Sequence, residues 1–212
     1  MIDHTLIRSR NLYYLSIPTY NQVWYTSIVK KLYFATSNPG KADEAAKILS
    51  VPIEIVKVDI DEIQSLDIKK IVEAKVRAAF KKIKKPVFID DVSAEVVAWN
   101  GFPGPFIKYL YEAGNNGHEL MLKMLESEKD KSVIIRAVIG FHDGKSVHII
   151  EGSFKGKLVP KKGNKGWGFD PYVIPDGYDK TFGEMDESLK NKISHRARAL
   201  RKFEKFLNSQ TS

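Results

Sequence analysis

The chain has 212 residues, of which 43% are hydrophobic, and its formal net charge is +8 at pH 7. This length suits one large domain or two small lobes with a real core. The absence of cysteine excludes disulfides, thiolate metal sites and a cysteine nucleophile. No apolar run approaches the ~20 residues that a membrane span needs, and the first residues hold no unbroken apolar segment. We therefore expect a cytoplasmic protein without a membrane partner.

The positive charge favours anionic partners such as nucleotides or nucleic acid. Aromatic residues make up 11% of the chain, and aromatics interleaved with basic residues also occur in nucleic-acid-binding modules. Solvated surface lysines account for most of the excess positive charge without any anionic partner. Charge alone therefore leaves an enzyme, a binding module and a merely soluble domain open.

The first part of the chain differs from the rest. Residues 1–30 show no sustained hydrophobic period, and we interpret them as an N-terminal extension outside the core fold. Residues 31–212 make up the expected folded domain.

A polar turn connects the first predicted strand, residues 31–36, to a helix rich in strong helix formers at residues 42–49. Asn38 is a plausible N-cap, and Pro39 suits the first helical turn. A strand, a tight turn and a helix N-terminus form an anion cradle, to which Lys41 would add a positive charge. An ordinary capped helix with an exposed lysine is the alternative.

This turn is not a Walker A loop. That pattern requires a glycine where Ala35 stands and a hydroxyl residue where Ala42 stands. A strand follows at residues 53–58, and apolar spacing predicts an amphipathic helix over residues 68–83. Lys75 on its outer face is most simply a solvated charge.

Two adjacent carboxylates, Asp90 and Asp91, follow a short buried strand predicted at residues 87–89, after Pro86. A strand that ends in acidic residues places them at the carboxyl edge of a sheet, where open α/β folds bind ligands. Two such carboxylates can hold a divalent cation and take a proton from water. The alternative is that one of them only caps the turn leading to Gly-Phe-Pro-Gly at residues 101–104.

Two helices, three strands and a final helix are predicted in the rest of the chain. The pattern predicts helices at residues 106–113 and 118–127, strands at 132–141, 146–150 and 153–159 with an Asp-Gly hairpin at 143–144, and a last helix at 188–207.

A glycine-dense loop at residues 161–175 separates the last strand from the last helix. Trp167 and Phe169 can stack on a base, and Asp170 can orient a polar edge. The glycines do not form the G-x-G-x-x-G pattern of a Rossmann site. The alternative is a folded loop whose aromatic residues plug the core.

Three hydrogen-bond donors in a row, Ser194, His195 and Arg196, interrupt the last helix. Lys190 lies one turn before Ser194, so the two share a helix face. The alternative is a basic, solvated helix.

Four motifs stand in order along the chain, namely TSNPGK, DD followed by GFPG, GWGFDP and SHR. Together with PDGY, TFGEM and KNKISHRARAL, they resemble the inosine triphosphate pyrophosphatase family from about Lys31 to the C-terminus. The resemblance implies an elongated, two-lobed α/β fold around a long mixed β-sheet, with a nucleotide-binding cleft. It also implies Mg²⁺-dependent hydrolysis of ITP, dITP and XTP to the monophosphate and pyrophosphate by a homodimer, with no stable nucleic-acid partner.

The resemblance also assigns roles to residues. Asp91 matches the general base and metal-associated carboxylate, with Asp90 beside it at the metal. The residues that match substrate contacts are Thr36, Ser37, Asn38 and Lys41 in the phosphate turn, Lys75 near the phosphates, Trp167, Gly168, Phe169 and Asp170 around the base, and Lys190, Ser194, His195 and Arg196 against base and phosphates.

Donors such as His195 and Arg196 suit the 6-carbonyl of hypoxanthine and xanthine. Adenine presents an amino donor at the same position, which would leave buried donors unpaired. Guanine also has a 6-carbonyl, so its exclusion has to come from the side of its 2-amino group.

Two departures from the family pattern keep a related hydrolase with a shifted substrate open. The family usually has Ser or Thr directly after the acidic pair, where Val92 stands. It also usually has a metal-binding glutamate early on the helix at residues 68–83, where a lysine stands. Glu62, Asp67 and Glu73 are the candidates to replace it.

Overall fold

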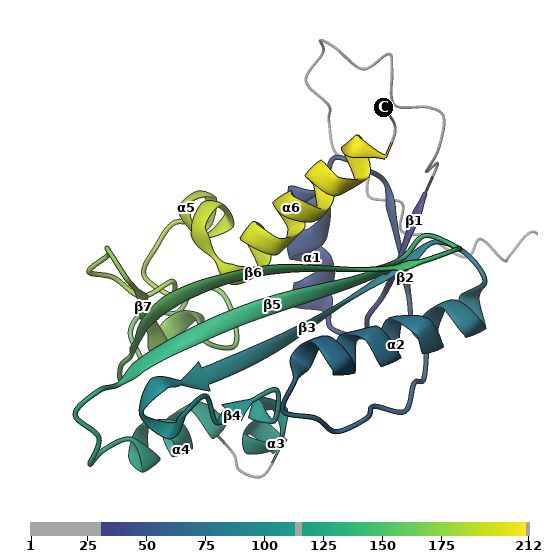
Figure 1. Cartoon of the computed structure of the whole chain (residues 1–212). Coiled ribbons are helices and arrows are strands. Elements are labelled where there is room, and N and C mark those ends of the chain that lie inside the picture. The colour runs from purple at the N-terminus through teal and green to yellow at the C-terminus, as the bar shows by residue number, and fades with distance from the viewer. Residues whose placement is uncertain (1–30, 113–115, 211–212) are drawn as a thin grey trace, which may run out of the picture.

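A long mixed β-sheet runs through the protein (Figure 1). The computed structural model describes residues 31–112 and 116–210, so the predicted extension at residues 1–30 lies outside the described residues. Within the described part, the strands are β1 Leu32–Ala35, β2 Ile53–Val56, β3 Val87–Val96, β4 Pro103–Gly104, β5 Ser132–His142, β6 Val147–Leu158 and β7 Val173–Pro175.

The sheet has the order β2-β1-β3-β5-β6-β7, and β4 pairs with β3 outside this path. β1 pairs in parallel with β2 and with β3. The pairs from β3 through β5 and β6 to β7 are antiparallel. The predicted α/β fold around a long mixed sheet is therefore confirmed.

Helices cover both faces of this sheet. They are α1 Pro39–Ile48, α2 Ile68–Ile83, α3 Ile107–Glu112, α4 Gly117–Met124, α5 Glu187–Ile193 and α6 His195–Ser209, with short 3-10 turns at Val97–Trp99 and Asp170–Tyr172. α2 packs Val72 and Val76 against Ile89 of β3 on one face. α6 packs Leu200 and Phe203 against the other face, as Figure 1 shows. No helix in the described ranges is long and apolar enough to cross a membrane.

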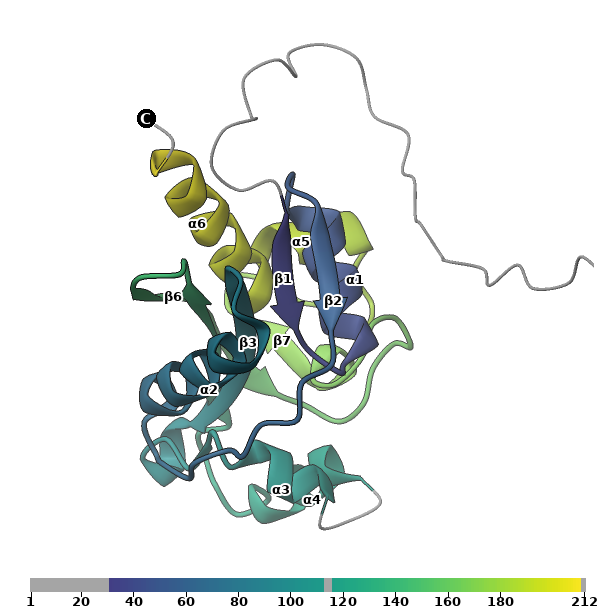
Figure 2. The same ribbon diagram turned by 90° about the vertical axis from the view of Figure 1, so that its right-hand side faces the viewer.

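The carboxyl ends of β1 and β2 point toward α3 and α4 in Figure 2. The polar turn after β1 and the link after β2 therefore lie on the side of the sheet that faces α3 and α4.

The prediction that a short strand ends before Asp90 is wrong. β3 continues to Val96, because β5 pairs with it antiparallel from Val87 to Val96. β1 pairs with β3 only at Val87 and Phe88. The acidic pair therefore lies within β3, just beyond the point where β1 ends.

Two further boundaries differ from the prediction. The strands expected at residues 146–150 and 153–159 form the single strand β6, because β5 supplies partners along its whole length. The helix expected at residues 188–207 is two helices that meet at Ser194. The Ser194 hydroxyl accepts a hydrogen bond from Ala197 N at 3.2 Å, so it is the N-cap of α6.

An aromatic cluster joins α3 and α4 to the glycine-dense loop. The His118 ring stacks on Tyr172 with 4.5 Å between centroids, and it meets Phe169 edge-on at 5.0 Å. Burial lowers the pKa of His118 from 6.5 to about 4. Protonation of this ring therefore opposes folding.

We expect this histidine to weaken the fold in mild acid. In the unfolded chain His118 gains a proton near pH 6.5, whereas in the folded chain it does so only near pH 4. Stability falls as the pH drops through this window, because the unfolded state binds more protons there. With an allowance for solvent screening, the His118 share of the loss is about 2 kcal/mol.

Urea unfolding at pH 7.5 and pH 4.5 measures this loss. His118→Phe keeps a ring against Tyr172 but cannot titrate, so its free energy of unfolding should fall about 2 kcal/mol less than that of the wild type. An identical pH dependence for the two proteins would contradict the assignment.

Candidate active site

A cavity of about 840 Å³, here called the main cavity, lies where the phosphate-type turn, β3, α2, α3 and the glycine-dense loop converge. It brings together residues that are far apart in the sequence. Its walls include these predicted site residues: Thr36, Ser37, Asn38, Lys41, Lys75, Asp90, Asp91, Trp167, Gly168, Phe169, Asp170, Lys190, His195 and Arg196. Ser194, also predicted, is buried at the N-cap of α6 and does not border it.

The turn after β1 is both a helix cap and a wall of the main cavity. Thr36 Oγ1 accepts from Asn38 N at 3.1 Å, and Asn38 Oδ1 accepts from Lys41 N at 3.2 Å, so the predicted N-cap is confirmed. Lys41 Nζ donates to the carbonyl of Asp90 and lies 3.7 Å from Asp91 Oδ1. The lysine therefore points across to β3, and the alternative of an exposed lysine is wrong.

Asp90 and Asp91 have different partners, because successive residues of a strand point to opposite faces. Asp90 Oδ2 accepts from Arg196 Nε at 2.5 Å, on the α6 side. Asp91 Oδ2 accepts from Lys75 Nζ at 3.0 Å, on the α2 side. Asp91 is therefore free of the buried guanidinium, while Asp90 is tied to it.

Lys75 is a part of the site rather than a solvated charge. It contacts Asp91 and also Glu62, in the link before α2. Burial alone would lower the pKa of Lys75, but Asp91 and Glu62 outweigh burial and raise it. The lysine is therefore charged, and it sits between two carboxylates.

The three candidates for the missing helix glutamate are separated by their contacts. Asp67 caps α2 by accepting from Lys69 N at 2.9 Å. Glu73 pairs with Arg77 on the exposed surface. Glu62 alone of the three borders the main cavity, where Asp91 also lies.

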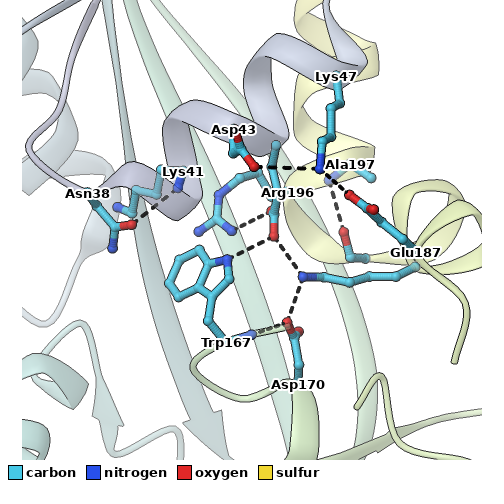
Figure 3. Close-up of polar contacts among 12 residues, drawn as sticks. Asn38, Lys41, Asp43, Lys47, Trp167, Asp170, Glu187, Arg196 and Ala197 are labelled. Atoms are coloured by element: carbon cyan, nitrogen blue, oxygen red, sulfur yellow. Dashed lines mark hydrogen bonds and ion pairs between the residues drawn. The ribbon is translucent and has the colours of Figure 1, made fainter. Parts of the chain in front are cut away.

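A buried ionic network forms the other end of the main cavity, and its centre is Glu44 of α1. Figure 3 shows Trp167, Asp170 and Arg196 gathered in this network. Glu44 accepts from Lys190 Nζ at 2.7 Å, from Arg196 Nη1 at 2.8 Å and from the indole Nε1 of Trp167 at 3.1 Å. Lys190 Nζ also donates to Asp170 Oδ2 at 2.6 Å. Sequence reasoning missed Glu44, and the only available signal was its position one turn after Lys41 on the same helix face.

Two acidic members of this network have pKa values that are shifted in opposite directions. Burial alone would raise the pKa of Glu44, but Arg196 and Lys190 outweigh burial and lower it. Burial raises the pKa of Asp170 despite its contact with Lys190. Burial, and then Arg196, hold the pKa of His195 well below 6.5, so its ring is neutral.

The two aromatic residues of the glycine-dense loop have different environments. Phe169 is buried against Tyr111 and His118, so it is a core residue. The residue Trp167 is 36% exposed and borders the main cavity. The guanidinium of Arg196 lies over the Trp167 ring, 4.9 Å from its centroid. Of the two, Trp167 presents its ring where a base could stack.

Asp170 and His195 complete this end of the site. Asp170 Oδ2 accepts from Trp167 N at 2.8 Å, which fixes the start of the loop turn. His195 Nδ1 is buried and has no hydrogen-bond partner among the described residues. Neither carboxylates nor histidines gather in groups of three or more suited to a metal within residues 31–112 and 116–210.

Comparison with known proteins agrees with this geometry. The Ham1 family model matches residues 32–206. The chain belongs to the Ham1 family. A relative called dITP/XTP pyrophosphatase, from Thermococcus kodakarensis, is 40% identical over 181 residues, or 84% of this chain and 97% of that protein. Another of the same name, from Ignicoccus hospitalis, is 38% identical over 190 residues, or 86% of this chain and 100% of that protein.

Solved structures of Ham1 proteins share the fold. The Ham1 protein of Staphylococcus aureus superposes with a TM-score of 0.74 at 26% identity, covering 85% of this chain and 100% of that one. The Ham1 match contains every residue that borders the main cavity. The cavity therefore lies within the shared domain.

We expect Glu44→Gln to destabilise the protein by about 3 kcal/mol, because it removes the charge that faces two buried cations. Urea unfolding at pH 7.5 measures the loss. The control is Glu187→Gln, which breaks the exposed pair between Glu187 and Lys47 and should cost less than about 1 kcal/mol. Equal losses in the two variants would show that Glu44 matters no more to the stability of the fold than an exposed ion pair does.

Proposed function

We propose that this protein is a nucleoside triphosphate pyrophosphatase that hydrolyses ITP, dITP and XTP to the nucleoside monophosphate and pyrophosphate. The observation that carries the proposal is the main cavity, which has a lysine-bearing end beside Asp91 and an aromatic, ionic end around Trp167 and Arg196. The names of the Thermococcus and Ignicoccus relatives support the same reaction.

The triphosphate suits the end of the main cavity that is formed by the turn after β1. Backbone N–H groups at the start of α1 and the side chains of Lys41 and Lys75 provide positive potential for phosphate oxygens. Because both lysines already contact Asp91, a phosphate bound by them is held close to that carboxylate.

Asp91 is the proposed general base. It takes a proton from a water molecule whose oxygen attacks the α-phosphorus, and the bond from that phosphorus to the bridging oxygen breaks. Pyrophosphate leaves with the electron pair of that bond, and the nucleoside monophosphate remains. Lys75 and Lys41 offset the charge that develops on the phosphate oxygens.

The site fits Mg²⁺, which we also propose as the cofactor. Glu62 and Asp91 offer carboxylate oxygens on the same wall, with Lys75 between them. Mg²⁺ typically uses one or two carboxylates together with substrate phosphates and water, so two acidic residues suffice. When bound, the ion would polarise the phosphate oxygens. Asp90 is a poorer candidate than the sequence suggested, because Arg196 occupies one of its oxygens.

The purine suits the opposite end of the main cavity, around Trp167 and Arg196. Arg196 uses Nε and Nη1 to hold Asp90 and Glu44, and its remaining N–H groups can donate to a 6-carbonyl. The 6-amino group of adenine would instead place a donor against these donors. Trp167 supplies the stacking surface. Homodimer assembly, which the family resemblance supports, and a cytoplasmic location, which the sequence pattern supports, are further parts of the proposal.

Asp91→Asn tests the role of the general base. We expect pyrophosphate release from ITP to fall roughly a thousandfold, because the amide cannot accept the proton of the attacking water. The control is Asp179→Asn on an exposed surface, which should leave the rate unchanged. Full activity of the Asp91 variant would refute the proposed mechanism, and equal rates with ITP, ATP and GTP would refute the base preference.

Glu62→Gln tests the proposed metal ligand. We expect the Mg²⁺ concentration for half-maximal activity to rise about tenfold, because a charged oxygen ligand is lost. Glu73→Gln is the matched control, since Glu73 was also a candidate ligand but lies on α2, where it pairs with Arg77 on the surface. The same Mg²⁺ requirement in wild type and Glu62→Gln would exclude Glu62 as a ligand.

A further inference from the structure

Trp167 lies directly against a residue that has no side chain. A Cβ atom placed on Gly40, in the first turn of α1, would lie 2.7 Å from Cε2 and Nε1 of the indole and 3.2 Å from its Cδ1. These distances are shorter than van der Waals contact, so any larger residue at this position would have to move the ring. The indole therefore packs on the backbone of α1 itself.

The same face of α1 also forms a hydrogen bond with the indole ring. Glu44 follows Gly40 by four residues, so the two lie above one another on α1. Glu44 Oε1 accepts from Trp167 Nε1 at 3.1 Å. The indole is thus held by α1 both through a hydrogen bond and through direct packing.

Neither helix geometry nor the main cavity explains a glycine at position 40. The residue is helical, and its φ lies outside the left-handed region that favours glycine. Alanine is the better helix former. Gly40 borders a second cavity of about 330 Å³, which Trp167 and Glu44 also line, and it does not border the main cavity. Because a Cβ on Gly40 would overlap the indole, a methyl group there would displace the ring that borders both cavities.

We propose that Gly40 is a positioning residue for base recognition, because its missing side chain sets where the Trp167 ring stands relative to the phosphate turn. α1 then carries phosphate-binding groups at its N-terminus and the base platform on its flank. The spacing between triphosphate and purine is fixed by one helix. This inference rests on the proposed function.

Gly40→Ala tests the inference in enzyme kinetics. The KM for ITP should rise about tenfold with kcat little changed, since part of the stacking contact is lost. Inorganic triphosphate, which has no base, should inhibit the variant and the wild type equally. Weaker inhibition by inorganic triphosphate would overturn the inference, because Gly40 would then serve the phosphates.

A double-mutant cycle separates packing from other effects. Once Trp167→Ala has removed the ring, adding Gly40→Ala should change the KM no further. Additive losses would overturn the inference, because they would mean that Gly40 acts without the indole.

A measurement on the protein without nucleotide tests the placement of Trp167 by Gly40 independently of the proposed function. In a chain with Trp24→Phe and Trp99→Phe, emission comes from Trp167 alone. Gly40→Ala should shift this emission in the free protein, while thermal unfolding shows that the fold is kept. Unchanged emission would overturn the positioning role. Failure of the wild type to release pyrophosphate from ITP would instead overturn the proposed function.

Discussion

The buried ion network around Glu44 is the constraint on which the site depends. It ties α1 to α5 through Lys190, to α6 through Arg196, and to the glycine-dense loop through Trp167. Arg196 continues the network to β3 through Asp90. Segments from both halves of the chain are therefore held together, four of them joined directly by Glu44 and β3 joined through Arg196.

Such a network is a poor source of net stability. The cost of removing charges from water offsets most of the attraction between them, and well-packed apolar residues can do as well or better. The network instead fixes the orientation of the side chains that belong to it. Two N–H groups of Arg196 are committed to Asp90 and Glu44, so the orientation of its remaining donors is set before any ligand binds. Rigid placement of donors is what discrimination between a carbonyl and an amino group requires.

Local features of the fold could be predicted from the sequence, and long-range ones could not. The helix at Ile68–Ile83 and the cap at Asn38 follow from nearby residues, and both are as predicted. The full length of β3 depends on pairing with β5, which no local pattern of β3 records. Local apolar runs therefore placed the end of this strand too early.

The candidate site also combines features that local sequence predicts with features that depend on long-range contacts. The four motifs supply 12 of the 26 described residues that border the main cavity, because their residues are adjacent within each motif. Glu44 lies in no polar cluster of its own, and its partners Trp167 and Arg196 are 123 and 152 residues away. Glu62 was one of three equivalent candidates until the chain path placed it beside Lys75. Contacts of this kind are properties of the tertiary structure.

The charge of the whole chain does not describe the charge of the site. Six cationic and seven acidic side chains border the main cavity among the described residues, so with His195 neutral its walls carry about one net negative charge. The +8 of the whole chain therefore comes from lysines elsewhere. A triphosphate brings several negative charges into walls that are not positive overall. The divalent cation proposed above would supply positive charge that these walls do not provide.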